Sequence, residues 1–287
     1  GVDWDRVYLE YRPRAEEARG DEILQLFHDM LSVLRDPHLY HKTKWGARFF
    51  PYVSPRLLAA RNTFDPQLVR SYFDEELLMA GRQGVEYGIL SGNIGYVRIT
   101  HFNLNNMMDD FPSVMGFVGG TDGLILDVRN NTGGDHDKVG AVVGEFIDSE
   151  MAWPMAFYAD GVRFEAWSAI QPSGSGGPYS KPVVVLINGA SLSSGELFPE
   201  VMKQLPNVTV VGETTAGASC NDRGEFRGDR YLPSGRMVHI PTGCITRYDG
   251  VPWELVGVPP DIRVVQTEAD VANGVDRQLE LALDLLR

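Results

Sequence analysis

The chain has 287 residues, 43% of them hydrophobic and 23% charged, which is typical of a globular protein with a large core in one or two domains. Its 39 acidic and 26 basic residues give a net charge of −13, which excludes nucleic acid and anionic membrane surfaces as favoured partners. The longest apolar runs are also too short to form a membrane span.

Residues 1–84 are predicted to be mainly helical. The segment 21–36 carries one apolar stripe, and Asp21 stands where a helix N-cap is expected. A second helix is expected to start with Asp65 as its N-cap and Pro66 at its first position. The pattern changes after this part of the chain, so we assign residues 1–84 to a helical N-terminal domain.

Strands and helices are expected to alternate from residue 85 onward. Two strands joined by a short turn open this part, and apolar helical segments follow later strands. Near the end, Thr267 and Asp270 stand in capping-box positions, and one helix is expected to run from there through "VDRQLELALDLL". This alternation predicts an α/β fold with parallel strand pairs over residues 85–287. The expected strands cover residues 85–90, 94–100, 123–128, 182–187 and 208–213.

Three serines stand in "NGASLSSGELFPE" (188–200), between a buried apolar run and a helical segment. This position places a hydroxyl at a helix N-terminus, where free main-chain N–H groups stabilise negative charge. Serine is also a favoured helix N-cap, and on the turn alone that ordinary role is the stronger interpretation. The turn by itself therefore does not decide between capping and catalysis for Ser191, Ser193 and Ser194.

A serine nucleophile also needs donors for its oxyanion and a base for its proton. Gly133 and Gly134 follow a buried strand, and glycines let main-chain N–H groups approach a ligand closely, although an ordinary glycine turn has the same sequence. None of the six histidines is distinguished by its chemistry alone. His136 follows the two glycines, whereas His38 and His41 lie in a loop behind a helix stop.

Six segments occur in the order of the motifs of one known family: "LRDPHLYH", "GYVRITHF", "LILDVRNNTGG", "VVVLINGASLSSGE", "VVGETTAG", and "LPSGRMVHIP" with "WELVGVPPDIRV". Together they resemble the S41 peptidases, which include the carboxy-terminal processing proteases and the tricorn-type proteases. The resemblance runs from residue 34 to about residue 265. It implies an α/β catalytic domain of the ClpP/crotonase type together with a helical N-terminal domain.

The family pattern Ser-x-Ser/Gly-Glu falls on residues 193–196 and implies that Ser193 is the nucleophile. It also implies an oxyanion hole made by main-chain N–H groups of Ser194 and of the Gly133–Gly134 pair. By this comparison Ser191 is a turn residue. We expect alanine to fit in place of Ser193, as it does in any turn where φ is negative.

The resemblance also separates two kinds of base. Processing proteases carry a lysine where this chain has Ala218, so the implied base and orienting group are those of the tricorn-type branch, which match His38 and Glu254. Pro37 stands where tricorn-type enzymes have a serine before the histidine. Lys203 lies within the helix after Ser193 and is not well placed by this comparison, and Lys138, beyond the glycine pair, is a remote alternative.

The resemblance therefore implies a serine peptidase that hydrolyses peptides or proteins through an acyl-enzyme, without a metal or an organic cofactor. The alternative on the same scaffold is a non-catalytic binding protein for a peptide or an apolar ligand, as in the retinoid-binding repeats of the family. Residues 42–91 leave no room for a PDZ module, so substrate recognition is expected from the catalytic and helical parts.

The two cysteines, Cys220 and Cys244, do not form a zinc pattern. They are either two buried thiols or a disulfide. We favour pairing near the active site, because Cys220 follows the turn of Ala218 and Cys244 precedes Glu254. An extracytoplasmic location, periplasmic or at the cell surface, is expected, with the signal segment absent from this chain.

Overall fold

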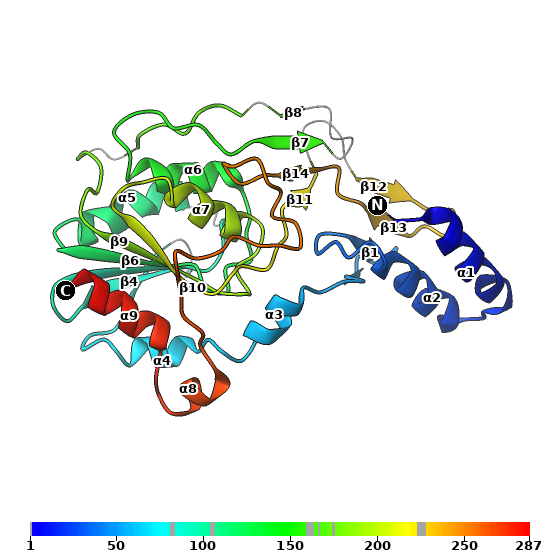
Figure 1. Cartoon of the computed structure of the whole chain (residues 1–287), viewed down its shortest axis with the longest axis horizontal. Helices are drawn as coiled ribbons and strands as arrows, with labels where there is room; N and C mark the ends of the chain where they lie inside the picture. The colour runs from blue at the N-terminus through cyan, green and yellow to red at the C-terminus, as the bar shows by residue number, and fades with distance from the viewer. Residues whose placement is uncertain are drawn as a thin grey trace.

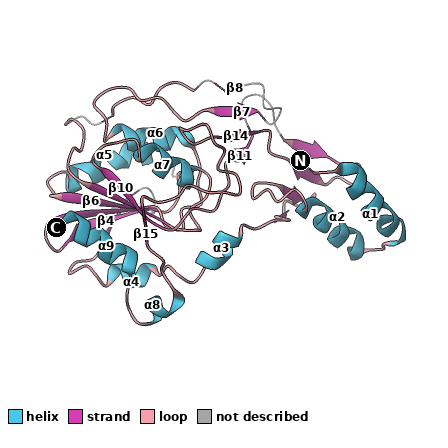
Figure 2. Ribbon diagram, in the orientation of Figure 1, coloured by secondary structure: helices cyan, strands magenta, loops and turns pink. Residues whose placement is uncertain are grey.

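The computed structural model describes residues 2–80, 84–103, 107–158, 164–165, 167–173, 176–222 and 228–287. It shows a main body built on a long sheet and a smaller arm that projects from this body (Figures 1 and 2). Helix α3 (Pro55–Ala60) lies on the path from the arm to the body, and the chain ends in the body. Within the described residues, no helix has the length and apolar character needed to cross a membrane.

The main sheet has seven strands in the order β15-β10-β9-β6-β5-β4-β3. In this sheet, β5, β6, β9, β10 and β15 pair in parallel with one another in turn. At one edge, β4 pairs antiparallel with both β5 and β3. This confirms the predicted α/β fold and the predicted hairpin of the fourth and fifth strands. The strands are β3 (Leu78–Ala80), β4 (Val85–Leu90), β5 (Ile94–Ile99), β6 (Gly123–Asp127), β9 (Val183–Ile187), β10 (Val208–Gly212) and β15 (Ile262–Arg263).

Helices cover both faces of this sheet, as Figure 1 shows. Helices α5 (Met107–Val118), α6 (His136–Gly144) and α7 (Ser194–Met202) pack on one face, and α4 (Pro66–Arg70) and α9 (Arg277–Leu286) pack on the other. Along β9, Val183, Val185 and Ile187 enter the first core, whereas Val184 and Leu186 enter the second. A strand buried on both faces needs an unbroken apolar run, which explains the sequence "PVVVLI".

The arm combines the N-terminal region with a later hairpin. Its sheet has the order β12-β13-β1-β2, and α1 and α2 lie beside it (Figure 1). A third sheet, β11-β14-β7-β8, lies between arm and body. The elements are α1 (Trp4–Glu17), α2 (Asp21–Ser32), β1 (Tyr40–Lys42), β2 (Arg48–Phe49), β7 (Ala156–Tyr158), β8 (Phe164–Glu165), β11 (Cys220–Asn221), β12 (Asp229–Tyr231), β13 (Met237–His239) and β14 (Gly243–Ile245).

The boundary expected at residue 84 does not coincide with a break in the structure. Strand β1 pairs with β13, far along the chain, and β3 pairs with β4 across residue 84. The segment 1–84 therefore contains helices, as expected, but it does not form a separate helical unit. Strand β1 has β2 as a partner within the segment and β13 as its partner on the other side, and a two-stranded sheet alone is only marginally stable in water.

Two helix ends also differ from the predictions. The N-cap of α2 is Gly20, at φ 57°, so Asp21 is the first helical residue. The closing helix is divided into α8 (Glu268–Ala272) and α9, with Gly274 at φ 73° between them. The predicted caps at Thr267 and Asp65 are confirmed, since Thr267 Oγ1 accepts from Asp270 N–H and Asp65 accepts from Gln67 N–H.

Candidate active site

Ser193 lies on the sharp turn between β9 and α7. Its φ is 57° and its ψ is −121°, a backbone conformation that L-residues rarely adopt. The expected negative φ was therefore wrong. A serine on a strained strand-to-helix turn presents its hydroxyl outward, and Ser193 is half-buried whereas Ser191 and Ser194 are buried.

The hydroxyls of the two neighbouring serines have structural partners. Ser191 Oγ donates to Val128 O (2.8 Å), and Ser194 Oγ donates to Gly134 O (2.6 Å). Within the described part of the chain, Ser193 Oγ donates no hydrogen bond. Of the three serines, Ser193 is thus the one whose hydroxyl proton is not already used to hold the turn together.

The glycine loop lies directly against this turn. A Cβ atom on Gly133 would lie 2.6 Å from Ser193 Cβ and 2.9 Å from Ser194 N, and φ at Gly133 is 86°. A Cβ atom on Gly195 would lie 2.6 Å from Asn131 O. Only glycine at both positions allows the two segments to approach so closely.

The main-chain N–H groups of this region differ in what they bind. Gly133 N–H donates to Asn131 Oδ1 (2.8 Å), so this group holds the loop itself. The N–H groups of Gly134 and Ser194 have no acceptor among the described residues. Main-chain donors that have no acceptor and belong to the serine turn and to the loop packed against it are candidates for binding an oxyanion.

Glu196 is completely buried in the first turn of α7. Its carboxylate accepts four hydrogen bonds, one of them from Ser193 N–H (3.0 Å). Burial raises the pKa of Glu196 to about 7, and the hydrogen bonds oppose that shift. The other three donors are Thr215 Oγ1 (2.5 Å), Gly217 N (2.7 Å) and Ala218 N (2.8 Å).

Glu254 lies in a turn that packs against residues 215–220. Its Oε2 accepts from Ser219 N–H (2.6 Å) and Cys220 N–H (3.0 Å), and its Oε1 is buried without a hydrogen-bond partner among the described residues. Burial raises the pKa of Glu254 to about 8, and the negative charge of Asp36 adds to the rise.

His38 is placed by the loop between α2 and β1. Asp36 Oδ1 accepts from the N–H groups of His38 (2.8 Å) and Leu39 (3.2 Å), which fixes the turn. Burial raises the pKa of Asp36 to about 6. Because Asp36 acts electrostatically on Glu254, the structure brings the loop of His38 to the neighbourhood of Glu254.

The predicted residues are thus linked to different degrees. Ser193, Ser194 and the glycine pair contact each other directly. Glu254 is joined to the serine turn through residues 215–220 and Glu196. His38 donates its main-chain N–H to Asp36, whose negative charge contributes to the raised pKa of Glu254.

His136 has other neighbours. Its ring stacks on Trp167 (4.6 Å between centroids), and its Nε2 lies 3.4 Å from Asp137 Oδ1. No metal is expected in the reaction, but ligand atoms of Asp135, His136 and Asp137 lie within 4.8 Å of one another. The two acids are exposed, and exposed acids commonly lie together without binding a metal.

Lys203, which the family comparison does not place well for a base, has structural contacts. Lys203 Nζ donates to Pro259 O (2.8 Å) and pairs with Asp261 (3.1 Å). Ala218, at the position of the lysine in processing proteases, is 1% exposed and donates its N–H to Glu196. This part of the turn therefore carries a carboxylate contact in place of a cationic side chain.

The cysteines form a disulfide, Cys220–Cys244, with 3.9 Å between their Cα atoms. They face each other across β11 and β14, and Cys220 N–H donates to Glu254. The favoured pairing near the site is confirmed.

The sequence did not predict the roles of Asp36 and Ser219 or the contacts of Glu196, although the pattern at residues 193–196 contains the glutamate.

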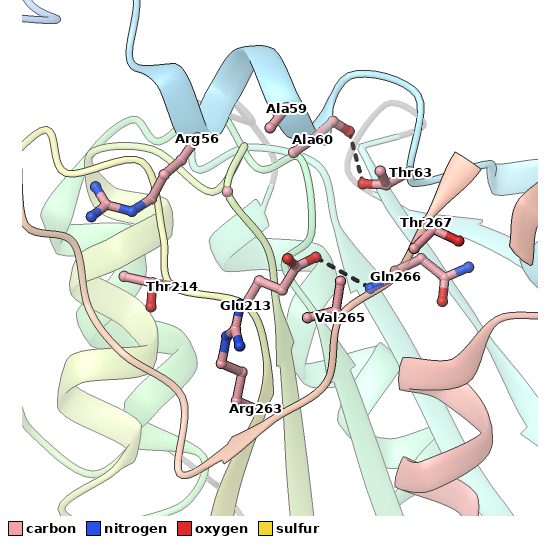
Figure 3. A pocket seen from close by; sticks show the side chains of 11 residues that line it. Arg56, Ala59, Ala60, Thr63, Glu213, Thr214, Arg263, Val265, Gln266 and Thr267 are labelled. Atoms are coloured by element: carbon pink, nitrogen blue, oxygen red, sulfur yellow. Dashed lines mark hydrogen bonds between the residues drawn. The ribbon is translucent and has the colours of Figure 1, made fainter. Parts of the chain in front are cut away.

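A pocket of ≈ 410 Å³ lies behind this region, at the ends of β9 and β10 (Figure 3). Figure 3 shows Arg56, Glu213 and Arg263 in its wall, and a hydrogen bond joins Gln266 N–H to Glu213 (3.4 Å). None of the predicted catalytic residues lines it. Arg56 of the pocket wall donates its guanidinium to Leu255 O (3.0 Å), next to Glu254.

Comparisons with known proteins find relatives that are longer than this chain. Tricorn protease homolog 1 of Streptomyces coelicolor is 30% identical over 219 residues, which are 74% of this chain and 19% of that protein. The carboxyl-terminal-processing protease of Synechocystis is 25% identical over 199 residues, which are 68% of this chain and 44% of that protein. The chain spans less than half the length of these curated relatives.

Solved structures give the same fold. A protein from Parabacteroides merdae, provisionally described as a peptidase, has a TM-score of 0.84 and 25% identity, covering 99% of this chain and 89% of that one. The tricorn protease has a TM-score of 0.55 and 16% identity, covering 98% of this chain and 34% of that one, a likeness in fold alone. The model of peptidase family S41 matches residues 93–264, more than half of the chain. The chain therefore belongs to peptidase family S41.

Proposed function

We propose that the chain is a serine peptidase with Ser193 as nucleophile, His38 as general base and Glu254 as the group that orients the histidine. One observation carries the proposal. Ser193 is the half-exposed serine on a strained turn, its hydroxyl proton is not used by the described residues, and two N–H groups without an acceptor stand beside it. Family membership makes a peptidase the expected activity.

In the first half of the reaction, His38 removes the proton of Ser193 Oγ, and Oγ attacks the carbonyl carbon of a peptide bond. The carbonyl oxygen becomes an oxyanion that accepts from the N–H groups of Gly134 and Ser194. Gly133 allows the glycine loop to lie close to Ser193, and its own N–H donates to Asn131 Oδ1. The imidazolium then protonates the leaving amine, and an acyl-enzyme remains.

In the second half, His38 removes a proton from water, which attacks the acyl-enzyme. Tetrahedral collapse releases the carboxyl product and returns the proton to Ser193. Glu254 holds the imidazole and stabilises its charge in both halves. Its Oε2 is already fixed by two N–H donors, which leaves Oε1 for this contact.

The substrate is a peptide or a protein, as expected for this family. The disulfide fits an oxidising compartment outside the cytoplasm, since disulfides persist there. Neither a metal nor an organic cofactor has a part in the proposed chemistry.

A fluorophosphonate probe tests the proposal, because it reacts with an activated serine hydroxyl. We expect labelling of the wild type at Ser193, no labelling of Ser193→Ala, and labelling of Ser191→Ala. Peptide mapping of the labelled protein identifies the residue. A folded wild type that the probe never labels would contradict the catalytic role and favour the alternative of a binding protein on the same scaffold.

A further inference from the structure

Residues 215–220 form a strip between two carboxylates, those of Glu196 and Glu254. Five groups of the strip donate to one or the other of these acids over 3.0 Å or less, and none of the five is shared between them. In chain order the donors are Thr215 Oγ1, Gly217 N and Ala218 N for Glu196, and then Ser219 N and Cys220 N for Glu254. The strip therefore fixes where one carboxylate lies relative to the other.

Glu196 is also bound to the nucleophile residue itself, since it accepts from Ser193 N–H (3.0 Å). We infer that Glu196 is a positioning residue, whose carboxylate ties the main chain of Ser193 to the strip that holds Glu254 and so sets the geometry between nucleophile and orienting group. This inference rests on the proposed function.

The chemistry of the four contacts requires a carboxylate. All four partners of Glu196 are donors, two on each oxygen, and a carboxylate offers acceptors only. A glutamine would accept on one atom and turn an NH₂ group toward the two donors on the other. Because the side chain is fully buried, water cannot replace the lost contacts.

Negative charges on two neighbouring acids raise the pKa of Glu254. The charge of Glu196 acts on Glu254, and Asp36 acts on Glu254 from the loop of the arm. The hydrogen bonds that Glu196 accepts oppose the effect of burial on its pKa. Its negative charge is therefore held by the N–H and O–H donors of the strip and of Ser193.

A matched control lies one turn further along the same helix. Glu200 is also buried, at 5% exposure, and it accepts from Tyr248 N–H (3.0 Å), outside the serine turn and the strip. Glu196→Gln and Glu200→Gln therefore make the same chemical change on one helix. Only the first breaks the link between Ser193 and Glu254.

The first experiment compares kcat and KM of the two variants on one peptide, together with the rate of fluorophosphonate labelling. We expect Glu196→Gln to lower kcat and labelling about 10- to 100-fold with KM nearly unchanged, since small misplacements of reacting groups cost factors of this size. Glu200→Gln should keep both rates. Equal rates in Glu196→Gln and wild type would overturn the inference and leave the proposed function standing.

A second pair of variants covers the case in which Glu196→Gln does not fold. Thr215→Val removes one of the four donors, and Thr215→Ser retains the hydroxyl. We expect the valine variant to lose kcat and the serine variant to recover it. Loss of the same size in both variants would contradict a role for this hydrogen bond.

A readout without catalysis separates the two proposals. In ¹⁵N spectra of the full chain, Glu196→Gln should shift the amide signals of Ser193 and also those of Ser219 and Cys220, whereas Glu200→Gln should shift none of the three. If the fluorophosphonate probe never labels the wild type, the proposed function fails. The amide shifts then still show whether Glu196 couples Ser193 to Ser219 and Cys220. Unchanged signals at Ser219 and Cys220 would overturn it.

Discussion

Cys220 donates its main-chain N–H to Glu254 Oε2 over 3.0 Å while its side chain is bonded to Cys244. One residue thus belongs both to the cross-link of β11 with β14 and to the contacts that fix the orienting carboxylate. The pairing of Cys220 opposite Cys244 holds β11 in place beside Glu254. The disulfide should therefore support both the stability and the geometry of the site.

We expect reduction of this disulfide, or the double change Cys220→Ser and Cys244→Ser, to lower the free energy of unfolding by about 2–4 kcal/mol. Peptidase activity should fall as well, because Glu254 loses a fixed donor. Thermal unfolding and activity with and without a reductant measure both effects. The double variant serves as the control, since it should not respond to the reductant. A wild type that is equally stable in both conditions would contradict this role.

Gly133→Ala should abolish activity. The new Cβ would lie 2.6 Å from Ser193 Cβ, and alanine at φ 86° is strained, so the loop and the serine turn must move apart. We expect at least a 10²-fold loss in kcat/KM, because the displaced loop carries the proposed oxyanion donor Gly134 with it, and the loss of one such donor usually costs this much. Gly116→Ala is the control, because nothing lies within 4 Å of its Cβ. Similar activity of the two variants would disprove the close approach.

The core of the fold was predictable because the apolar runs follow the sheet. The run at residues 182–187 contains β9, which is buried on both faces, and β4 and β5 form the predicted hairpin. The arm was not predictable in this way. Strand β1 has three residues and obtains its hydrogen bonds from β13, nearly 200 residues later, a pairing that no local pattern contains.

At the candidate site, the sequence identified the nucleophile turn but not its internal contacts. Ser193, Ser194 and the glycine pair could be named only through the resemblance to the S41 peptidases, because the turn alone does not separate a catalytic serine from a helix cap. The contacts of Glu196 with residues 215–218 connect distant turns, and they depend on main-chain N–H directions that side-chain identity does not encode. The assignment of His38 stays a prediction.

Chelators should not inhibit the peptidase. Asp135, His136 and Asp137 lie close enough to share a cation, but none of them contributes to the proposed proton transfers. We expect unchanged kcat/KM in EDTA and an active His136→Ala variant. Activity that EDTA removes and zinc restores, together with an inactive His136→Ala variant, would contradict a metal-free mechanism and would assign a role to this cluster.

The pH dependence of activity depends on two groups. His38 must be neutral to accept a proton, and a free histidine has a pKa of about 6.5. Glu254 must be ionised to stabilise the imidazolium, and burial raises its pKa to about 8. We therefore expect kcat/KM to rise with pH through roughly 7–8, above the limit that histidine alone would set. A pH–rate profile on one peptide measures this.

Three variants show which group causes this rise of kcat/KM with pH. His38→Ala should lose about 10³-fold or more in rate at every pH. Asp36→Asn removes a negative charge that raises the pKa of Glu254, so the rise should move to lower pH, while the asparagine oxygen still accepts from His38 N–H. Glu254→Gln should be slow, and its kcat/KM should not show the part of the rise that depends on the ionisation of Glu254. A His38→Ala variant of normal rate would show that another group is the base.

The stability of the fold should change with pH in the opposite sense. The folded pKa of Glu254 lies above its ordinary value of 4.5, so the folded state holds this proton more tightly than the unfolded state does. The stabilising contribution is therefore complete below about pH 4.5 and is lost as pH rises through about 8. Chemical denaturation between pH 6 and 9 should show a decline that is smaller in Glu254→Gln. If activity rises over the pH interval in which stability falls, ionised Glu254 serves the reaction at a cost to the stability of the fold. If activity and stability change with pH in the same direction, this assignment is contradicted.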